Sequence, residues 1–141
     1  MSKLLSGCRV LVVEDEMLIL MGIEDMLAEL GCENVTAAPS VARALALIEA
    51  QKFDVAMLDA NLGGETSNAI ADALAARQIP FFFATGYRDL GADIGHQNRQ
   101  VLNKPFQLPD LERSFREALS PGYNERDFGA TNGKTAGGVT R

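Results

Sequence analysis

The chain has few of the residues that metal centres and disulfide frameworks need. Its 141 residues include two cysteines, Cys8 and Cys32, a single histidine, His96, and no tryptophan. The cysteines are far apart in sequence, and neither has a second Cys or His at a zinc-ligand spacing, which excludes the common zinc sites. We therefore expect both thiols to be reduced and mostly buried, as in a cytoplasmic protein.

Long hydrophobic runs and an excess of positive charge are also missing. The longest apolar stretch, Met17 to Ile23, is too short to cross a bilayer. The amino-terminal sequence MSKLLSG lacks the apolar core of a signal peptide. A net charge of -6 gives no basic footprint for nucleic acid or an anionic membrane. With 47% apolar residues, the chain suits one soluble globular domain.

Short apolar segments alternate with amphipathic ones along most of the chain. Strands are expected over residues 9–13, 34–38, 55–58, 80–85 and 101–103. About five helices follow or separate them, the last starting near Pro109, and the helix within 86–100 is expected to be short or poorly formed. This alternation predicts an α/β fold with right-handed crossovers and a parallel sheet covered on both faces. The expected architecture is flavodoxin-like and doubly wound, with the strand order 2-1-3-4-5 of such sheets.

Apolar residues spaced three and four apart predict the buried faces of the helices. Gly31 is expected to end the first helix, and Ser40 to cap the second. Glu65 to Ser67 is expected to lead into the third. The residues expected to face the core are Ile19, Ile23, Met26, Leu27 and Leu30; Val41, Ala44, Leu45 and Ile48; Ile70, Ala73 and Leu74; and Leu111, Phe115, Ala118 and Leu119.

The composition changes beyond residue 119. Residues 120–141 are rich in Gly, Thr and Asn and show no apolar periodicity, which predicts a flexible tail. The expected organisation is therefore one domain over 1–119 and a tail over 120–141, with no output domain.

Polar side chains follow four of the expected strands where each strand ends. Asp59 ends the apolar run of FDVAMLDANLGG, and Glu14 with Asp15, Thr85 and Lys104 end three others. Because the carboxyl ends of parallel strands share one rim, these side chains should lie close together. Carboxylates so placed repel one another, and a lysine with a divalent cation could hold them; oxygen ligands suit Mg²⁺. With its surroundings neutralised, Asp59 is a plausible nucleophile toward phosphorus.

Taken together, these pieces resemble the receiver domain of two-component response regulators over residues 7–119. The matching pieces are VLVVEDE, the strand that ends at Asp59, FFFATGY and NKPF. The resemblance implies a single-domain response regulator whose Asp59 takes a phosphoryl group from the phosphohistidine of a sensor histidine kinase or phosphotransfer protein. It further implies signalling through an unknown downstream protein, or action as a phosphoryl shuttle or sink.

The resemblance also implies a metal-binding role for several of these residues. Asp15 and Asp59 would bind Mg²⁺ directly, and the main-chain carbonyl of Asn61 would be a further ligand. Glu14 belongs to the outer acidic pair and would bind the metal, if at all, through water.

Other residues are implied in phosphorylation and switching. Lys104, held by a cis bond to Pro105, would pair with the acceptor and then with the phosphoryl oxygens. Thr85 would be the hydroxyl that swings to the phosphoryl group. Tyr87 and Gly86 are possible modulators of the site, through water access and phosphoryl lifetime.

The chain departs from the usual family pattern at two positions. Val101 replaces the usual aromatic residue three positions before the lysine, and Thr85-Gly86 replaces the usual threonine-alanine step. These features resemble a receiver subgroup with a Phe-Ala-Thr-Gly-Tyr motif, common among stand-alone regulators. They favour a switch that orders residues 86–100 over rotation of an aromatic side chain. The partner surface is expected to include 86–100 and the last helix.

Two other functions remain open. A pseudo-receiver would keep the fold as a binding module without being phosphorylated. A haloacid-dehalogenase-type phosphatase needs a second aspartate two residues after the first, where this chain has Asn61. A histidine kinase or phosphotransfer protein is disfavoured because His96 lies outside any convincing helix. A receiver would not be an enzyme beyond catalysing its own phosphorylation and dephosphorylation.

Overall fold

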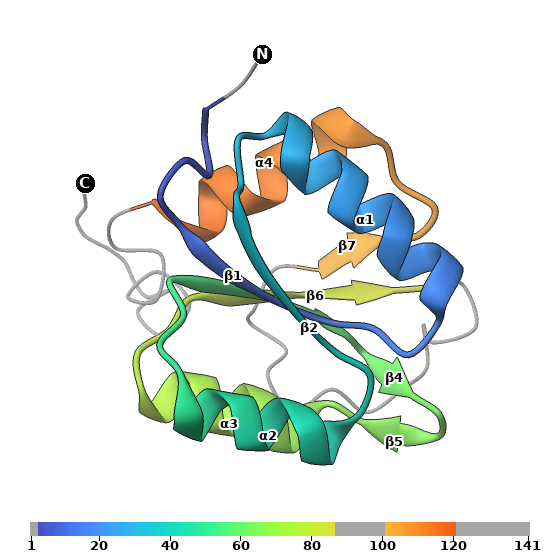
Figure 1. Ribbon diagram of the computed structural model, residues 1–141. Coiled ribbons are helices and arrows are strands. Elements are labelled where there is room, and N and C mark those ends of the chain that lie inside the picture. Colours follow the sequence, from blue (N-terminus) through green and yellow to red (C-terminus); the bar gives the residue numbers. More distant parts are fainter. Residues whose placement is uncertain (1–2, 87–100, 121–141) are drawn as a thin grey trace, which may run out of the picture.

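A single five-stranded parallel sheet organises the chain. The computed structural model describes residues 3–86 and 101–120. The sheet has the order β2-β1-β3-β6-β7, with all neighbouring strands parallel (Figure 1). Its strands are β1 (Arg9–Val13), β2 (Asn34–Ala38), β3 (Val55–Asp59), β6 (Phe81–Thr85) and β7 (Val101–Asn103). The flavodoxin-like order predicted from the sequence is confirmed.

Four helices within the described residues cover the two faces of this sheet. Helices α1 (Met17–Glu29) and α4 (Leu108–Ala118) lie on one face, and α2 (Val41–Ala50) and α3 (Asn68–Ala76) lie on the other (Figure 1). None of these helices is long and apolar enough to span a membrane. The helix expected within 86–100, Tyr87, His96 and the tail beyond Ser120 lie outside the described residues.

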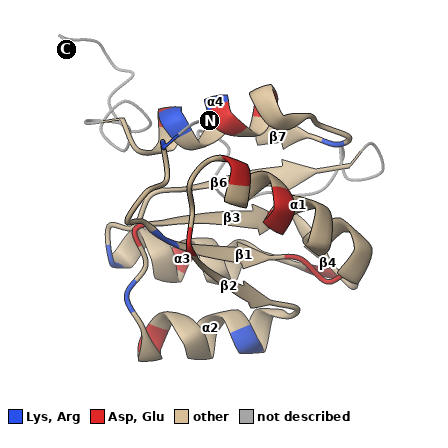
Figure 2. Ribbon diagram, turned by 45° about the horizontal axis from the view of Figure 1, so that its top comes forward, with Lys and Arg blue, Asp and Glu red and all other residues tan. Residues whose placement is uncertain are grey.

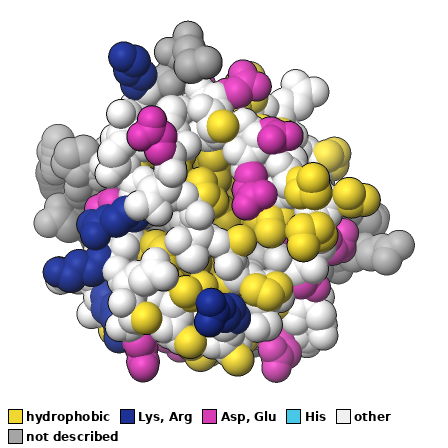
Figure 3. Space-filling view, viewed as in Figure 1, with side chains coloured by type: hydrophobic (Ala, Val, Ile, Leu, Met, Phe, Trp, Pro, Cys, Tyr) yellow, Lys and Arg dark blue, Asp and Glu magenta, His cyan; other side chains and the backbone are white. Residues whose placement is uncertain are grey.

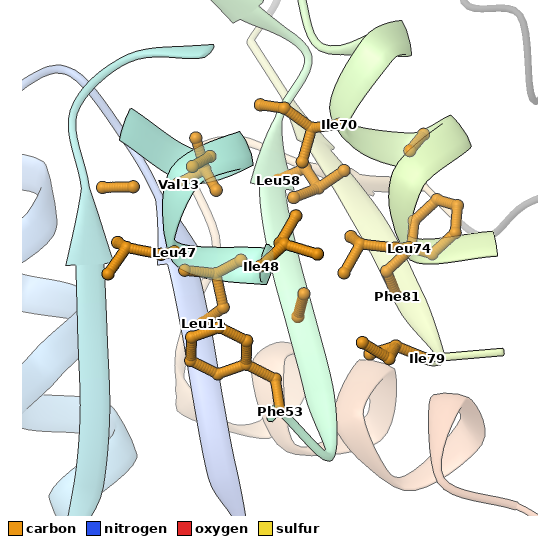
Figure 4. Packing of buried hydrophobic residues seen from close by; sticks show 14 of the residues in the cluster. Leu11, Val13, Leu47, Ile48, Phe53, Leu58, Ile70, Leu74, Ile79 and Phe81 are labelled. Atoms are coloured by element: carbon orange, nitrogen blue, oxygen red, sulfur yellow. The ribbon is translucent and has the colours of Figure 1, made fainter. Parts of the chain in front are cut away.

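The central strands are buried on both faces, which explains their nearly continuous apolar sequences. In β1, Leu11 and Val13 pack toward α2 and α3, whereas Val10 and Val12 pack toward α1 and α4. Figure 4 shows the first of these two layers. Its labelled side chains are Leu11, Val13, Leu47, Ile48, Phe53, Leu58, Ile70, Leu74, Ile79 and Phe81.

Most of the predicted helix faces are buried, with one informative difference in α1. Ile23 and Leu27 are buried as expected, together with Leu20, which the sequence had not placed in the core. Ile19 and Met26 are only partly buried and line a cleft beside the helix. The apolar surface of α1 is therefore wider than the core alone requires.

The predicted helix boundaries follow from local hydrogen bonds. The Ser40 hydroxyl accepts a hydrogen bond from the main-chain N–H of Arg43 at 3.2 Å, which caps α2. At the end of α1, Gly31 has a φ of 89° and donates to the carbonyl of Ala28, while Cys32 donates to that of Leu27. This pair of bonds is a Schellman motif, which requires the left-handed conformation that glycine adopts easily.

The segment after β3 differs from the prediction. Glu65 to Ser67 lead into α3 as expected, but Glu65 and Thr66 also form β5 (Glu65–Thr66), which pairs antiparallel with β4 (Asn61–Leu62). Gly63 and Gly64 join the two strands with φ values of 60° and 95°. A two-residue hairpin turn with both central residues at positive φ favours glycine strongly. The Gly63-Gly64 pair is therefore a local hairpin signal in the sequence.

Candidate functional site

The polar residues predicted at the strand ends meet at one rim of the sheet. Glu14 follows β1, Asp59 ends β3, Thr85 ends β6 and Lys104 follows β7. The acidic connection between β1 and α1 and the basic position after β7 lie on the same side of the molecule (Figure 2). The parallel arrangement brings them together because every carboxyl end points the same way.

Three carboxylates form a compact cluster at this rim. Glu14, Asp15 and Asp59 each offer an oxygen within 4.8 Å of the other two. Glu14 and Asp59 are only 3% and 6% exposed, whereas Asp15 faces solvent. The main-chain N–H of Glu16 donates to Glu14 Oε2 at 3.2 Å, which orients that buried carboxylate. The cluster therefore combines two buried acids with one acid at the surface.

Lys104 bridges the two buried carboxylates. Its Nζ lies 3.0 Å from Glu14 Oε1 and 3.4 Å from Asp59 Oδ2. Burial lowers the pKa of Lys104, but the charges of Asp59 and Glu14 outweigh this and leave that pKa raised. The lysine thus stays charged, as its two acidic neighbours require. The Lys104–Pro105 peptide bond is cis, as the resemblance implies.

Asp59 is an unusually basic carboxylate. Burial raises its pKa from 3.8 to about 6, and the neighbouring charge of Glu14 acts in the same direction. Lys104 and the main-chain N–H of Asn61, which donates to Oδ1 at 3.3 Å, oppose that rise. Each oxygen of the carboxylate therefore has a donor nearby, but these donors do not fully offset the free-energy cost of burying the negative charge.

The donor set fits a hard divalent cation. Among the described residues, Lys104 is the one cation paired with these three carboxylates, so the site keeps an excess of negative charge. Asn61 also borders the same cleft. Oxygen ligands with excess negative charge and an exposed side suit Mg²⁺, which retains several of its waters when bound.

Thr85 and Gly86 connect this rim to the end of β6. The Thr85 hydroxyl is buried and donates to the main-chain carbonyl of Gly86 at 3.3 Å. The main-chain carbonyl of Thr85 accepts a hydrogen bond from the N–H of Lys104 at 2.8 Å. Gly86 borders the cleft. The predicted switch hydroxyl therefore lies beside the site but is directed at the main chain. Tyr87, the other suggested modulator, lies outside the described residues.

A cleft of about 820 Å³ extends from the acidic cluster along α1. Sequence reasoning missed its apolar half. The lining residues beyond the rim are Leu18, Ile19, Gly22, Ile23 and Met26 of α1, Gly63 and Gly64 of the hairpin, and Pro105 with Phe106. Next to it, Met17, Leu18 and Met21 are 67%, 84% and 52% exposed. Figure 3 shows hydrophobic side chains gathered on the right, over α1.

Comparison with known protein families agrees with this geometry. Residues 10–116 match the family described as response regulator receiver domain. The chain belongs to this family. The match spans β1 to the last turn of α4 and so includes the whole rim just described.

Individual relatives place the receiver among signalling proteins. It is 33% identical over 134 residues to the transcriptional regulatory protein PdtaR of Mycobacterium tuberculosis, covering 91% of this chain and 63% of PdtaR. The receiver therefore spans less than two thirds of that relative's length. The solution structure of SdrG from Sphingomonas melonis Fr1 has 45% identity and a TM-score of 0.72, covering 80% of this chain and 97% of SdrG.

Two other solved structures represent functional states. The BeF3-activated conformation of SdrG from Pseudomonas melonis Fr1 has 44% identity and a TM-score of 0.70, covering 82% of this chain and 98% of that one. The receiver domain of sensor histidine kinase PA1611 from Pseudomonas aeruginosa, with magnesium coordinated in its active site cleft, has 25% identity and a TM-score of 0.68. It covers 81% of this chain and 98% of that one.

Proposed function

We propose that this receiver is a response regulator that accepts a phosphoryl group on Asp59 from the phosphohistidine of a sensor histidine kinase or phosphotransfer protein. The observation that carries the proposal is the position of Asp59, which lines an open cleft and lies beside Glu14, Asp15 and Lys104. The activated and magnesium-bound structures of its relatives support the same chemistry. The protein would act in the cytoplasm, and would catalyse only its own phosphorylation and dephosphorylation.

In the transfer, an ionised Asp59 oxygen attacks phosphorus as the phosphorus–nitrogen bond of the donor breaks. The bonding electron pair returns to the imidazole nitrogen of the donor, and Asp59 becomes an acyl phosphate. Lys104, already 3.4 Å from Asp59, is placed to neutralise charge on the phosphoryl oxygens. Asp15, Asp59 and the Asn61 carbonyl would hold Mg²⁺, with Glu14 bound to it through water. Bound Mg²⁺ supplies further neutralisation of the phosphoryl oxygens.

The response to phosphorylation would start at Thr85. Its hydroxyl would leave the Gly86 carbonyl, 3.3 Å away, and donate to a phosphoryl oxygen instead. Freed from that bond, Gly86 and the segment that begins with it would rearrange and alter a downstream protein's binding surface. Tyr87 would then affect the access of water to the acyl phosphate.

We place the docking site of the phosphodonor on the apolar side of the cleft. Leu18 is the most exposed large hydrophobic side chain of α1 and lines the cleft that contains Asp59. A donor helix that covered this surface would bring its histidine toward the acceptor and exclude water. This extends the partner surface predicted from the sequence, which comprised 86–100 and the last helix.

Two substitutions to aspartate test that placement. Leu18→Asp should slow phosphotransfer from the kinase by at least roughly tenfold, because a charge would enter the apolar contact. Its rate with a small phosphodonor should stay within about twofold of wild type. Ala46→Asp, at an exposed position of α2 on the other face of the sheet, is the matched control. Equal slowing by both variants would refute the docking site.

The acceptor itself is tested with a small phosphodonor and Mg²⁺, by intact mass. The wild type should gain about 80 Da, the mass of one phosphoryl group, and Asp59→Asn should gain nothing. A gain in both proteins would show that another residue is the acceptor. No gain in either, with folding intact, would favour the pseudo-receiver that binds partners without phosphorylation.

A further inference from the structure

Two free cysteines lie next to each other at the amino end of the sheet, opposite the rim that carries Asp59 and Lys104. Cys8 directly precedes β1, and Cys32 lies between α1 and β2. The Cys32 thiol donates to the main-chain carbonyl of Cys8, with a sulfur–oxygen distance of 3.8 Å. Both side chains pack against the same hydrophobic cluster, on the α1 and α4 face of the sheet. The proposed phosphorylation does not use either thiol.

The contact between the Cys32 thiol and the Cys8 carbonyl, next to the start of the β1–β2 pairing, brings the two residues close enough for a disulfide. β1 and β2 are paired, and their first partners are Arg9 and Asn34. Cys8 is one residue before that pair on β1, and Cys32 is two residues before it on the neighbouring chain segment. Adjacent strands are about 4.8 Å apart, and disulfides join Cα atoms roughly 4.4 to 6.8 Å apart. Both side chains pack against the hydrophobic cluster on the α1 and α4 face, so the two sulfur atoms lie on the same side of the sheet.

We propose that Cys8 and Cys32 form a reversible intramolecular disulfide by exchange with a small-molecule disulfide such as oxidised glutathione. The Cys8 thiolate attacks the glutathione disulfide, forms a mixed disulfide and releases one glutathione. The Cys32 thiolate then attacks the Cys8 sulfur, closes the protein disulfide and releases the second glutathione. Two protein thiols are oxidised, and one glutathione disulfide is reduced to two thiols.

The environments of the two thiols set the order and the speed of the exchange. Cys8 is half-buried, whereas Cys32 is buried, so the external disulfide reaches Cys8 first. Burial raises the pKa of Cys8, and the neighbouring Asp54 and Cys32 add to that rise; burial raises the pKa of Cys32 as well. Both thiols are therefore largely protonated at neutral pH, and the exchange proceeds slowly.

Intact mass spectrometry of the full chain tests the proposal. Reduced protein incubated with oxidised glutathione under native conditions should lose about 2 Da, and a non-reducing digest should contain the Cys8 and Cys32 peptides joined. Cys32→Ala should stop at the mixed disulfide and gain about 305 Da. Cys8→Ala should stay unmodified because Cys32 is buried. A wild type that remains reduced, stops at the mixed disulfide or forms covalent dimers would overturn the proposal.

Thermal unfolding tests whether the native fold accommodates the disulfide without strain. The disulfide would join residues 24 positions apart in sequence, so the oxidised protein should unfold several degrees higher than the reduced one. The reductant dithiothreitol should reverse the shift. An unchanged or lower Tm in fully cross-linked protein would contradict the claim that the native arrangement accommodates the bond.

Discussion

Replacing Asp59 by asparagine should stabilise the metal-free receiver while abolishing its phosphorylation. Asp59 is 6% exposed, and burial with the charge of Glu14 raises its pKa to about 6. The ionised Asp59 carboxylate therefore destabilises the folded state at neutral pH. Asparagine has the same size and no charge, and its amide can still accept the Asn61 N–H, so the substitution removes the cost without leaving a cavity.

The size of the effect follows from the pKa of Asp59 in the folded and unfolded states. A rise from 3.8 to about 6 corresponds to about 3 kcal/mol between the two protonation states. Because the folded pKa is the higher one, the folded state binds the proton more tightly. Stability therefore falls as pH rises from 3.8 to about 6, and the full cost is present above that range. At pH 7.5 the variant should be up to about 3 kcal/mol more stable, roughly 10 °C in Tm.

Urea unfolding of both proteins in EDTA at pH 7.5 and pH 4.5 provides the measurement. The stability difference should be largest at pH 7.5 and shrink strongly at pH 4.5, where the wild-type carboxyl is largely protonated. Asp54→Asn is a control of opposite sign. Asp54 accepts two side-chain hydrogen bonds from Arg9, at 3.1 Å each, and the Arg9 guanidinium lowers its pKa. That variant should lose stability at pH 7.5.

Magnesium should reduce the stability advantage of Asp59→Asn over the wild type. A cation bound at the cluster stabilises only the folded state, and it does so more for the wild type than for Asp59→Asn. Saturating Mg²⁺ should therefore reduce or cancel the advantage of the variant. If Asp59→Asn were equally or less stable than wild type in EDTA at pH 7.5, the inferred electrostatic cost of Asp59 would be wrong.

Three further substitutions probe the rim. Asp15→Asn should weaken Mg²⁺ binding roughly 10- to 100-fold by calorimetry with little change in metal-free stability, since Asp15 is exposed; unchanged affinity would remove Asp15 from the ligand set. Lys104→Gln should lower the free energy of unfolding by roughly 3 kcal/mol at pH 7.5, because Glu14 and Asp59 lose their cation; a neutral outcome in urea unfolding would refute this. Gly63→Ala should cost about 1 kcal/mol from its φ of 60° alone, since the new methyl group would lie 3.8 Å from Asp15 Oδ2; a larger loss would indicate a clash.

The polar residues at the rim could be predicted from the sequence because each of them directly follows a strand whose pattern is local. A buried parallel strand has a short apolar sequence, and a polar residue that ends this run lies at the rim of the sheet. Asp59 after Val55–Leu58 is the clear case, whereas the short strand before Lys104 buries only Leu102 and leaves Val101 and Asn103 exposed. The helix stop at Gly31 was predictable for the same reason, because the conformation that it adopts depends on a few neighbouring residues.

Features that depend on how distant segments face one another were not predictable in this way. The sequence placed Lys104 opposite Asp59, yet its shorter contact is with Glu14. That choice depends on the side-chain directions at three strand ends. The apolar half of the cleft needs α1 and the Pro105–Phe106 segment to be adjacent, although they are far apart in sequence. The excess of apolar residues in Met17–Ile23 was the one local signal for it.

Lys104 lies closer to Glu14 than to Asp59, and this difference explains how Asp59 can remain reactive in a site with several charges. Within the described part of the chain, Asp59 has two donors. The contacts to Lys104 Nζ, at 3.4 Å, and to the Asn61 N–H, at 3.3 Å, are both longer than ordinary strong hydrogen bonds. Glu14 takes the closer contact with the lysine at 3.0 Å and is almost fully buried. Glu14 thus holds the Lys104 ammonium at the rim and keeps it from pairing tightly with Asp59. A carboxylate held in place by weak donors retains the electron pairs that an attack on phosphorus requires.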